Sequence, residues 1–128
     1  MRYHIDTDFL VMALSTAGPE RRRLIRLAES EAELQMSAVA WYEFSRGPRT
    51  PEQLSIARSF FFDDGIVPFS EELAALAGDV FRRLGSPRRR AADVAIGVCS
   101  AALGATLLTR NAADFAGIPG LQIETVSG

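Results

Sequence analysis

The chain has 128 residues, of which 48% are hydrophobic, so it can bury the core of one domain without disulfides. Its single cysteine, Cys99, excludes an internal disulfide, and its net charge of −2 excludes a uniformly basic nucleic-acid-binding protein. The first ten residues carry several charges, and the longest apolar run, residues 94–108, is interrupted by polar residues and glycines. We therefore expect no signal peptide and no membrane-spanning segment, and a cytoplasmic protein with one domain over residues 1–128.

Predicted strands and helices alternate along the chain. Strands are expected over residues 2–6, 34–37, 65–67, 105–109 and 121–125. Helices are expected over residues 9–14, 20–31 and 39–46, from about residue 50 behind a Thr-Pro start, and over residues 70–84 and 91–104. This alternation predicts an α/β domain whose mainly parallel sheet is covered by helices on both faces.

Four carboxylates lie at or near the predicted strand ends, where open parallel sheets usually place their sites. Asp6 ends the first strand, and Asp114 follows the fourth. Glu43 lies in the helix after the second strand, and Asp93 lies early in the helix before the fourth. Each of them has an ordinary structural explanation, such as capping a helix, but their joint occurrence favours one acidic site.

Asp93 is the most informative of the four residues. It is the only charged residue between Arg90 and Arg110, inside an almost wholly apolar segment. A helix that is apolar on nearly all sides is buried, and a buried carboxylate must be paired, protonated or bound to a metal ion. The alternative is an aspartate of the first helical turn that interacts with the helix dipole, which contributes about 0.3–1 kcal/mol.

Convergence of these carboxylates would require a cation. Two carboxylates about 4 Å apart repel each other by roughly 4 kcal/mol at an effective dielectric constant of about 20. They would take up protons or bind a divalent ion, and an all-oxygen set of ligands suits Mg²⁺ or Mn²⁺. His4 and Cys99 are single residues without zinc-ligand spacing, so we expect both to be structural. Because no nucleophile motif is present, metal-activated hydrolysis of a phosphate ester is the predicted chemistry.

Four segments of the chain resemble the motifs of PIN-domain ribonucleases. They are residues 4–10 (HIDTDFL), 37–44 (SAVAWYEF), 91–96 (AADVAI) and 107–115 (LLTRNAADF). Their order, their spacing and the length of the chain are similar to those of the toxin of a VapBC-type toxin–antitoxin pair. The resemblance implies a PIN-like three-layer α/β/α sandwich with a central, mainly parallel sheet of four to five strands.

The resemblance also implies roles for the acidic residues. Asp6 and Asp93 would be the principal Mg²⁺ ligands, directly or through water, with Mn²⁺ as a possible substitute. Glu43 and Asp114 would complete the catalytic pocket and could also ligate the metal, some of them through water. Asp8 stands where the family commonly has asparagine, and we favour a helix cap over an extra pocket charge for it.

Three further residues would support the site. Thr7 and Thr109 would orient ligands or water through their hydroxyl groups. Asn111 occupies a position that is often acidic in the family, so either Asn111 or Asp114 fills the fourth corner.

The family resemblance implies an endoribonuclease toxin that forms a homodimer and is blocked by a small antitoxin in its acidic groove. All 14 basic residues are arginine, and many lie in two clusters, residues 21–26 and 82–90. These arginines suit contacts with RNA phosphates or with the antitoxin, or else they form solvated helix faces. The candidates for such contacts are Arg88, Arg89, Arg90 and Arg110.

Two other functions are compatible with parts of this pattern. A catalytically silent PIN-like interaction domain would keep the fold without the reaction. A haloacid-dehalogenase-like phosphatase would explain the Asp-Thr-Asp after the first strand, but that chemistry needs a lysine, which this chain lacks. Transfer, ribosomal and messenger RNA are all compatible substrates of the proposed nuclease.

Overall fold

A five-stranded parallel sheet forms the centre of the computed structural model, which describes residues 1–126. The strand order is β3–β2–β1–β4–β5, and each neighbouring pair is parallel. The strands are β1 (Arg2–Ile5), β2 (Glu33–Ser37), β3 (Ile66–Val67), β4 (Thr106–Leu108) and β5 (Gln122–Glu124). The predicted α/β architecture is therefore confirmed, with all pairings parallel rather than most of them.

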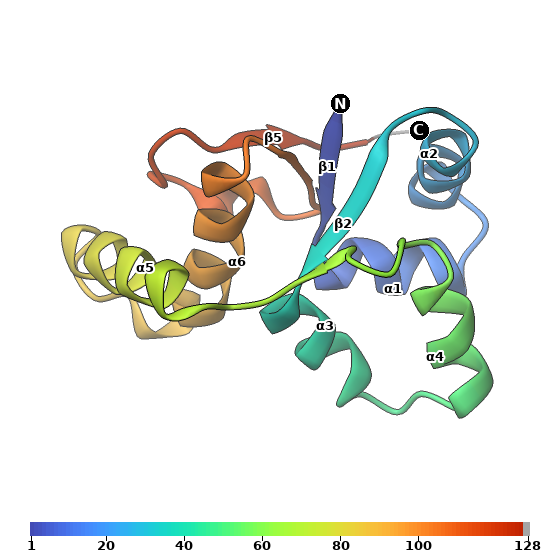
Figure 1. Ribbon diagram of the computed structural model, residues 1–128, viewed down its shortest axis with the longest axis horizontal. Coiled ribbons are helices and arrows are strands. Elements are labelled where there is room, and N and C mark those ends of the chain that lie inside the picture. The colour runs from blue at the N-terminus through green and yellow to red at the C-terminus, as the bar shows by residue number, and fades with distance from the viewer. Residues whose placement is uncertain (127–128) are drawn as a thin grey trace.

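Helices cover both faces of this sheet and complete an α/β/α sandwich. In Figure 1, α1, α2 and α4 lie on one side of the strands and α5 and α6 on the other, while α3 begins where β2 ends. The helices are α1 (Thr7–Ser15), α2 (Pro19–Ala28), α3 (Ala38–Ser45), α4 (Pro51–Arg58), α5 (Glu71–Arg83) and α6 (Ala91–Ala102). Within the described residues, no helix is both long enough and apolar enough to cross a membrane.

Burial of the central strands on both faces explains their composition. Tyr3, His4 and Ile5 are all buried in β1, as are Leu107 and Leu108 in β4, because parallel strands between two helical layers meet no solvent. His4 and Cys99 are fully buried, as expected for structural residues.

Capping residues set the helix boundaries. Asp6 caps α1, which therefore starts at Thr7, two residues before the predicted start. Thr50 caps α4 in a full capping box with Gln53, as its Thr-Pro start indicates. The sequence pattern did not predict two short 3₁₀ helices, η1 (Arg88–Arg90) and η2 (Ala112–Phe115), because single turns have no hydrophobic period.

A close approach between α6 and the η2 region positions two of the acidic residues. Residues 94–100 of α6 are all buried, and Gly97 faces this region. A Cβ atom at Gly97 would lie 2.5 Å from Cδ1 of Ile118 and 3.3 Å from Cδ1 of Phe115. Since α6 carries Asp93 and η2 carries Asp114, the missing side chain lets these two elements come together.

Replacement of this glycine tests the packing. Gly97→Ala should lower the free energy of unfolding by about 1 kcal/mol, because overpacking against the buried side chains of Ile118 and Phe115 outweighs the gain in helix propensity. Gly78→Ala on α5 is the matched control, since its Cβ would meet nothing nearer than 3.8 Å. It should stabilise the protein by up to about 1 kcal/mol through helix propensity. Urea unfolding of both variants measures the difference, and equal effects would contradict the close approach.

Candidate active site

The four predicted carboxylates surround one open cavity at the carboxyl ends of the strands. Its volume is about 420 Å³. Its walls come from α1, α3, the loop between α3 and α4, α6 and the η2 region. The lining residues are Asp6, Thr7, Asp8, Val11, Glu43, Arg46, Arg49, Asp93, Asn111 and Asp114. Segments that are far apart in the sequence thus meet at the carboxyl ends of the strands, where parallel sheets usually place their sites.

Asp6 is the most constrained carboxylate in the cavity. It follows β1 directly and is 5% exposed. Its Oδ1 accepts a 2.8 Å hydrogen bond from the backbone N–H of Thr7, and its Oδ2 accepts one of 2.8 Å from the hydroxyl of Thr109. Asp6 is thus both the cap of α1 and a wall of the cavity.

Thr109 and Thr7 each hold a carboxylate in place. The Thr109 hydroxyl is fully buried, donates to Asp6 and accepts the backbone N–H of Asn111 at 3.0 Å. The Thr7 hydroxyl lies 3.0 Å from Oε1 of Glu43 and 3.2 Å from the carbonyl oxygen of Ala40. Two hydroxyl groups therefore connect β1, β4 and α3 at the cavity.

The pKa values of Asp6 and Asp93 are raised by the surroundings of the cavity. Burial raises the pKa of Asp93 from 3.8 to about 7, and the charges of Asp6, Asp114, Glu43 and Asp8 add to this effect. Burial also raises the pKa of Asp6 to about 6, although the hydrogen bonds from Thr109 and Thr7 oppose the change. Asp6 and Asp93 thus resist ionisation in this company, as the sequence predicted.

Asn111 and Asp114 both lie at the cavity. Asp114 is exposed on η2 and lines the cavity with a carboxylate. Asn111 donates from Nδ2 to Oδ2 of Asp8 at 3.1 Å. Asp8 lies in the first turn of α1, lines the cavity and does not cap the helix, so the preferred interpretation of Asp8 as the cap was wrong because Asp6 occupies that position.

The donor set fits a hydrated divalent cation. Within residues 1–126, no three His, Cys, Asp or Glu side chains come close enough together to coordinate one ion as they stand. Mg²⁺ is usually bound by one or two carboxylates and keeps several of its waters, so it does not need a cage of protein ligands. The hard oxygen donors and the raised pKa values of Asp6 and Asp93 both favour such an ion.

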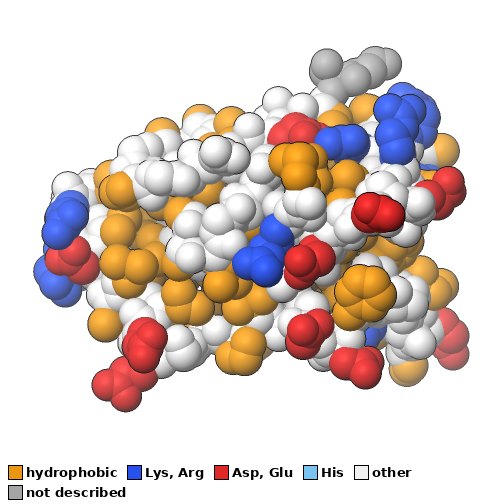
Figure 2. All heavy atoms as spheres, turned by 45° about the horizontal axis from the view of Figure 1, so that its top comes forward, with side chains coloured by type: hydrophobic (Ala, Val, Ile, Leu, Met, Phe, Trp, Pro, Cys, Tyr) orange, Lys and Arg blue, Asp and Glu red, His pale blue; other side chains and the backbone are white. Residues whose placement is uncertain are grey.

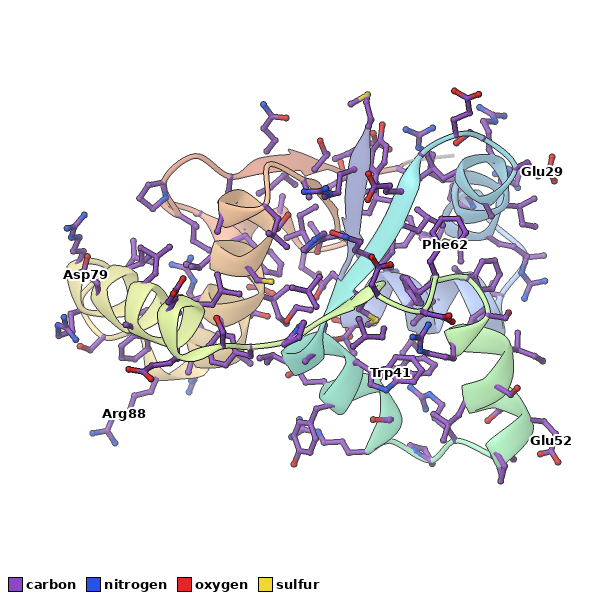
Figure 3. All side chains as sticks on the ribbon, viewed as in Figure 1. Glu29, Trp41, Glu52, Phe62, Asp79 and Arg88 are labelled. Atoms are coloured by element: carbon purple, nitrogen blue, oxygen red, sulfur yellow. The ribbon has the colours of Figure 1, made fainter. Side chains whose placement is uncertain are left out.

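Most of the arginines that the sequence nominated for RNA or partner contacts are used within the chain or lie apart. Arg90 donates to the carbonyl oxygens of Asp114 at 2.8 Å and Ala116 at 2.6 Å, which holds η2 in place. Arg110 lies 3.6 Å from a carboxylate oxygen of Glu20. Arg88 and Arg89 are exposed, and Figure 3 shows Arg88 pointing away from the molecule.

The two wider arginine clusters form no continuous basic patch on the face drawn in Figure 2, where acidic and hydrophobic side chains separate the basic ones. Arg23 pairs with Glu124, and both Arg82 and Arg83 pair with Asp79. These three arginines, which the sequence offered as candidates for contacts with RNA phosphates, are therefore paired with carboxylates of the same chain.

Two arginines that sequence reasoning missed do line the cavity: Arg46 and Arg49. Arg46 lies three residues after Glu43, and its guanidinium is 4.0 Å from the Glu43 carboxylate. That helical spacing could have indicated Arg46. Arg49 follows the end of α3 and the Gly47-Pro48 turn, so no periodicity could have placed it.

Comparison with known proteins identifies the family. The PIN domain family model matches residues 3–121, and the chain belongs to that family. No match to a curated protein sequence reaches significance.

Solved structures share the fold at low sequence identity. VapBC2 from Rickettsia felis, bound to a DNA fragment from its promoter, matches with a TM-score of 0.76 and 23% identity over 99% of this chain and 100% of that chain. A toxin–antitoxin complex from Klebsiella pneumoniae matches with a TM-score of 0.72 and 23% identity, covering 98% and 96% of the two chains. DNA-bound VapBC from Salmonella typhimurium matches with a TM-score of 0.73 and 18% identity over 98% of each chain.

The raised pKa of Asp93 predicts a pH-dependent stability. The folded state keeps a proton on this group between about pH 4 and 7 that the unfolded state has lost, so stability falls as pH rises through this window. Asp93→Asn removes this loss and should stabilise the metal-free protein at pH 8 by about 1–2 kcal/mol, after allowance for partial exposure. Chemical unfolding at pH 5 and pH 8 measures the effect.

Magnesium provides the control for this prediction. Added Mg²⁺ should raise the melting temperature of the wild type and have a much smaller effect on Asp93→Asn, since a ligand stabilises only the state that binds it. A wild type that is no less stable at pH 8 than Asp93→Asn would contradict the unfavourable burial of this carboxylate.

Proposed function

We propose that this PIN-domain protein is a Mg²⁺-dependent endoribonuclease that acts as the toxin of a toxin–antitoxin pair. The observation that carries the proposal is the ring of carboxylates around one cavity, in which burial and mutual repulsion raise the pKa values of Asp6 and Asp93. The Rickettsia, Klebsiella and Salmonella structures named above are toxin–antitoxin complexes with the same fold, which supports the biological role.

Asp6 and Asp93 are the residues proposed to hold the cation, with Glu43 and Asp114 contributing directly or through water. A divalent ion bound there would lower the pKa of a water and neutralise charge on the phosphate. Mn²⁺ has similar ligand preferences and is the expected substitute.

The residues of the chain orient the reactants. Thr109 and the Thr7 backbone hold both oxygens of Asp6, so that this carboxylate cannot turn away from the cavity. Thr7 also donates a hydrogen bond to Oε1 of Glu43, and the guanidinium of Arg46 lies 4.0 Å from Oε2. The Glu43 carboxylate is thus held at the cavity wall, where it would accept a proton from the attacking water. Asp114, exposed at the mouth of the cavity, is placed to meet the substrate or its hydration shell.

The alternatives predict different behaviour. A silent PIN-like interaction domain would show neither nuclease activity nor a response to divalent ions. A haloacid-dehalogenase-like phosphatase would hydrolyse small phosphomonoesters, but that chemistry needs a lysine, and the basic side chains that line the cavity within residues 1–126 are Arg46 and Arg49. The proposed nuclease has RNA as its substrate, a small antitoxin as its inhibitor, and a second copy of the chain as its partner in a homodimer.

Purified protein tests the chemistry. RNA incubated with the wild type and Mg²⁺ should be cut internally and leave 5′-phosphate and 3′-hydroxyl ends, because water attacks the phosphorus. Asp93→Asn and Glu43→Gln should lower kcat by about 100-fold or more. Asp79→Asn is the control, because Asp79 lies on α5 outside the cavity (Figure 3), and its activity should be unchanged. Products with cyclic 2′,3′-phosphate ends would show attack by the RNA itself and overturn this mechanism.

Expression in bacteria tests the toxin role. Induction of the wild type alone should stop growth, and co-expression of the small gene expected beside it should restore growth. Asp93→Asn should abolish the toxicity while the protein accumulates to the same level. Growth arrest that persists in this variant would separate toxicity from the acidic cavity, and sequencing of cleaved transcripts from wild type and Asp6→Ala would identify the RNA.

A further inference from the structure

Arg49 has an unusual position for a charged side chain. It is half-buried, and its guanidinium carbon lies 4.7 Å from the centre of the Phe44 ring. Phe44 is itself buried and stacks on Trp41 with ring centres 5.7 Å apart, and Figure 3 shows Trp41 between α3 and α4. The aromatic support of Arg49 is therefore fixed by the core.

A glycine makes room for this guanidinium. A Cβ atom at Gly47 would lie 3.1 Å from Nη1 and 3.3 Å from Cζ of Arg49. Gly47 thus allows the guanidinium to pack directly against the backbone that follows α3. The position of Arg49 is defined from two sides, by a ring and by a turn.

The guanidinium of Arg49 has no acceptor in the described part of the chain. Among residues 1–126 it makes no hydrogen bond and no ion pair, although it carries five N–H donors. Arg46, the other arginine of the cavity wall, has the carboxylate of Glu43 at 4.0 Å. Arg49 is therefore the cavity arginine whose charge and donors are left for a ligand.

Arg49 also lies where two hollows meet. It lines the acidic cavity, and it lines a second cavity of about 190 Å³ between α1, α3 and α4. The second cavity is mostly apolar and shares Val11 as well as Arg49 with the acidic one. A chain-like ligand that leaves the acidic cavity in this direction must pass the guanidinium of Arg49.

We propose that Arg49 binds a backbone phosphate of the RNA next to the phosphate that is cleaved, and so directs the strand toward the second cavity. This inference rests on the proposed ribonuclease function. A strand entering a cavity with five carboxylates is repelled, and a cation at the wall offsets this repulsion for the flanking phosphate. The planar fork of an arginine matches phosphate oxygens in pairs, which gives position as well as charge.

Cleavage kinetics provide the first test. With a short single-stranded RNA that contains one mapped cleavage site, Arg49→Ala should lower kcat/KM about tenfold, mainly through KM, since it removes a contact made in the bound substrate too. Arg49→Lys should recover part of the loss, because it keeps the charge but loses the paired geometry. Arg26→Ala is the control, an exposed arginine of α2 outside the cavity, and should match the wild type.

A substrate with one uncharged linkage provides the second test, and it does not depend on equal stability of the variants. A methylphosphonate replaces each phosphate flanking the cleavage site in turn. At one of these positions the wild type should lose about tenfold in kcat/KM, whereas Arg49→Ala should lose little, since the partner of that phosphate is already absent. Equal losses in both proteins at every position would overturn the assignment.

The outcomes separate this inference from the proposed function. If the wild type and Arg49→Ala cleave RNA equally well, the proposed role of Arg49 is wrong and the proposed ribonuclease function stands. If that variant instead lost binding to the antitoxin, measured by titration with the purified partner, its guanidinium would serve a protein carboxylate and the RNA assignment would be wrong. A wild type without any nuclease activity would remove both.

Discussion

Repulsion among carboxylates held around one cavity is the constraint on which the rest of this site depends. The parallel sheet places the ends of β1, β2 and β4 together, and the residues that follow them include Asp6, Glu43 and Asp114. Asp93 reaches the same cavity from the first turn of α6, which precedes β4. Burial in such company raises the pKa of Asp93 to about 7 and that of Asp6 to about 6. The fold therefore holds an arrangement that is unfavourable in isolation and favourable once a cation or protons are present, as at many functional sites.

Asp6 connects this unfavourable arrangement to the stability of the fold. It directly follows the central strand β1, caps α1 and accepts a hydrogen bond from the buried hydroxyl of Thr109. A side chain with these three roles cannot move without loosening β1, α1 and the segment after β4. The carboxylate is thus oriented by interactions that stabilise the protein in any case, and its position in the cavity needs no separate support.

The charges of the chain divide into a structural set and a small set at the site. Arg23, Arg82 and Arg83 pair with acidic residues, and Arg90 binds carbonyl oxygens near Asp114. Arg49 has no such partner among the described residues, and it lies at the cavity. A net charge of −2 is therefore compatible with the proposed binding of a polyanion, because local geometry and the proposed cation, rather than overall charge, would govern the contact.

The sequence by itself determined the order of the elements, the parallel sheet and the carboxylates at its edge, because these follow from hydrophobic period, turn residues and the ends of strands. The isolation of Asp93 among apolar residues was likewise visible in the sequence. Only the tertiary structure decided that Asp8 faces the cavity, where it meets Asn111 from 103 residues away, and that the guanidinium of Arg49 lies over Phe44 with no acceptor among residues 1–126. Such contacts depend on which distant segments become neighbours, and a local pattern carries no information about that.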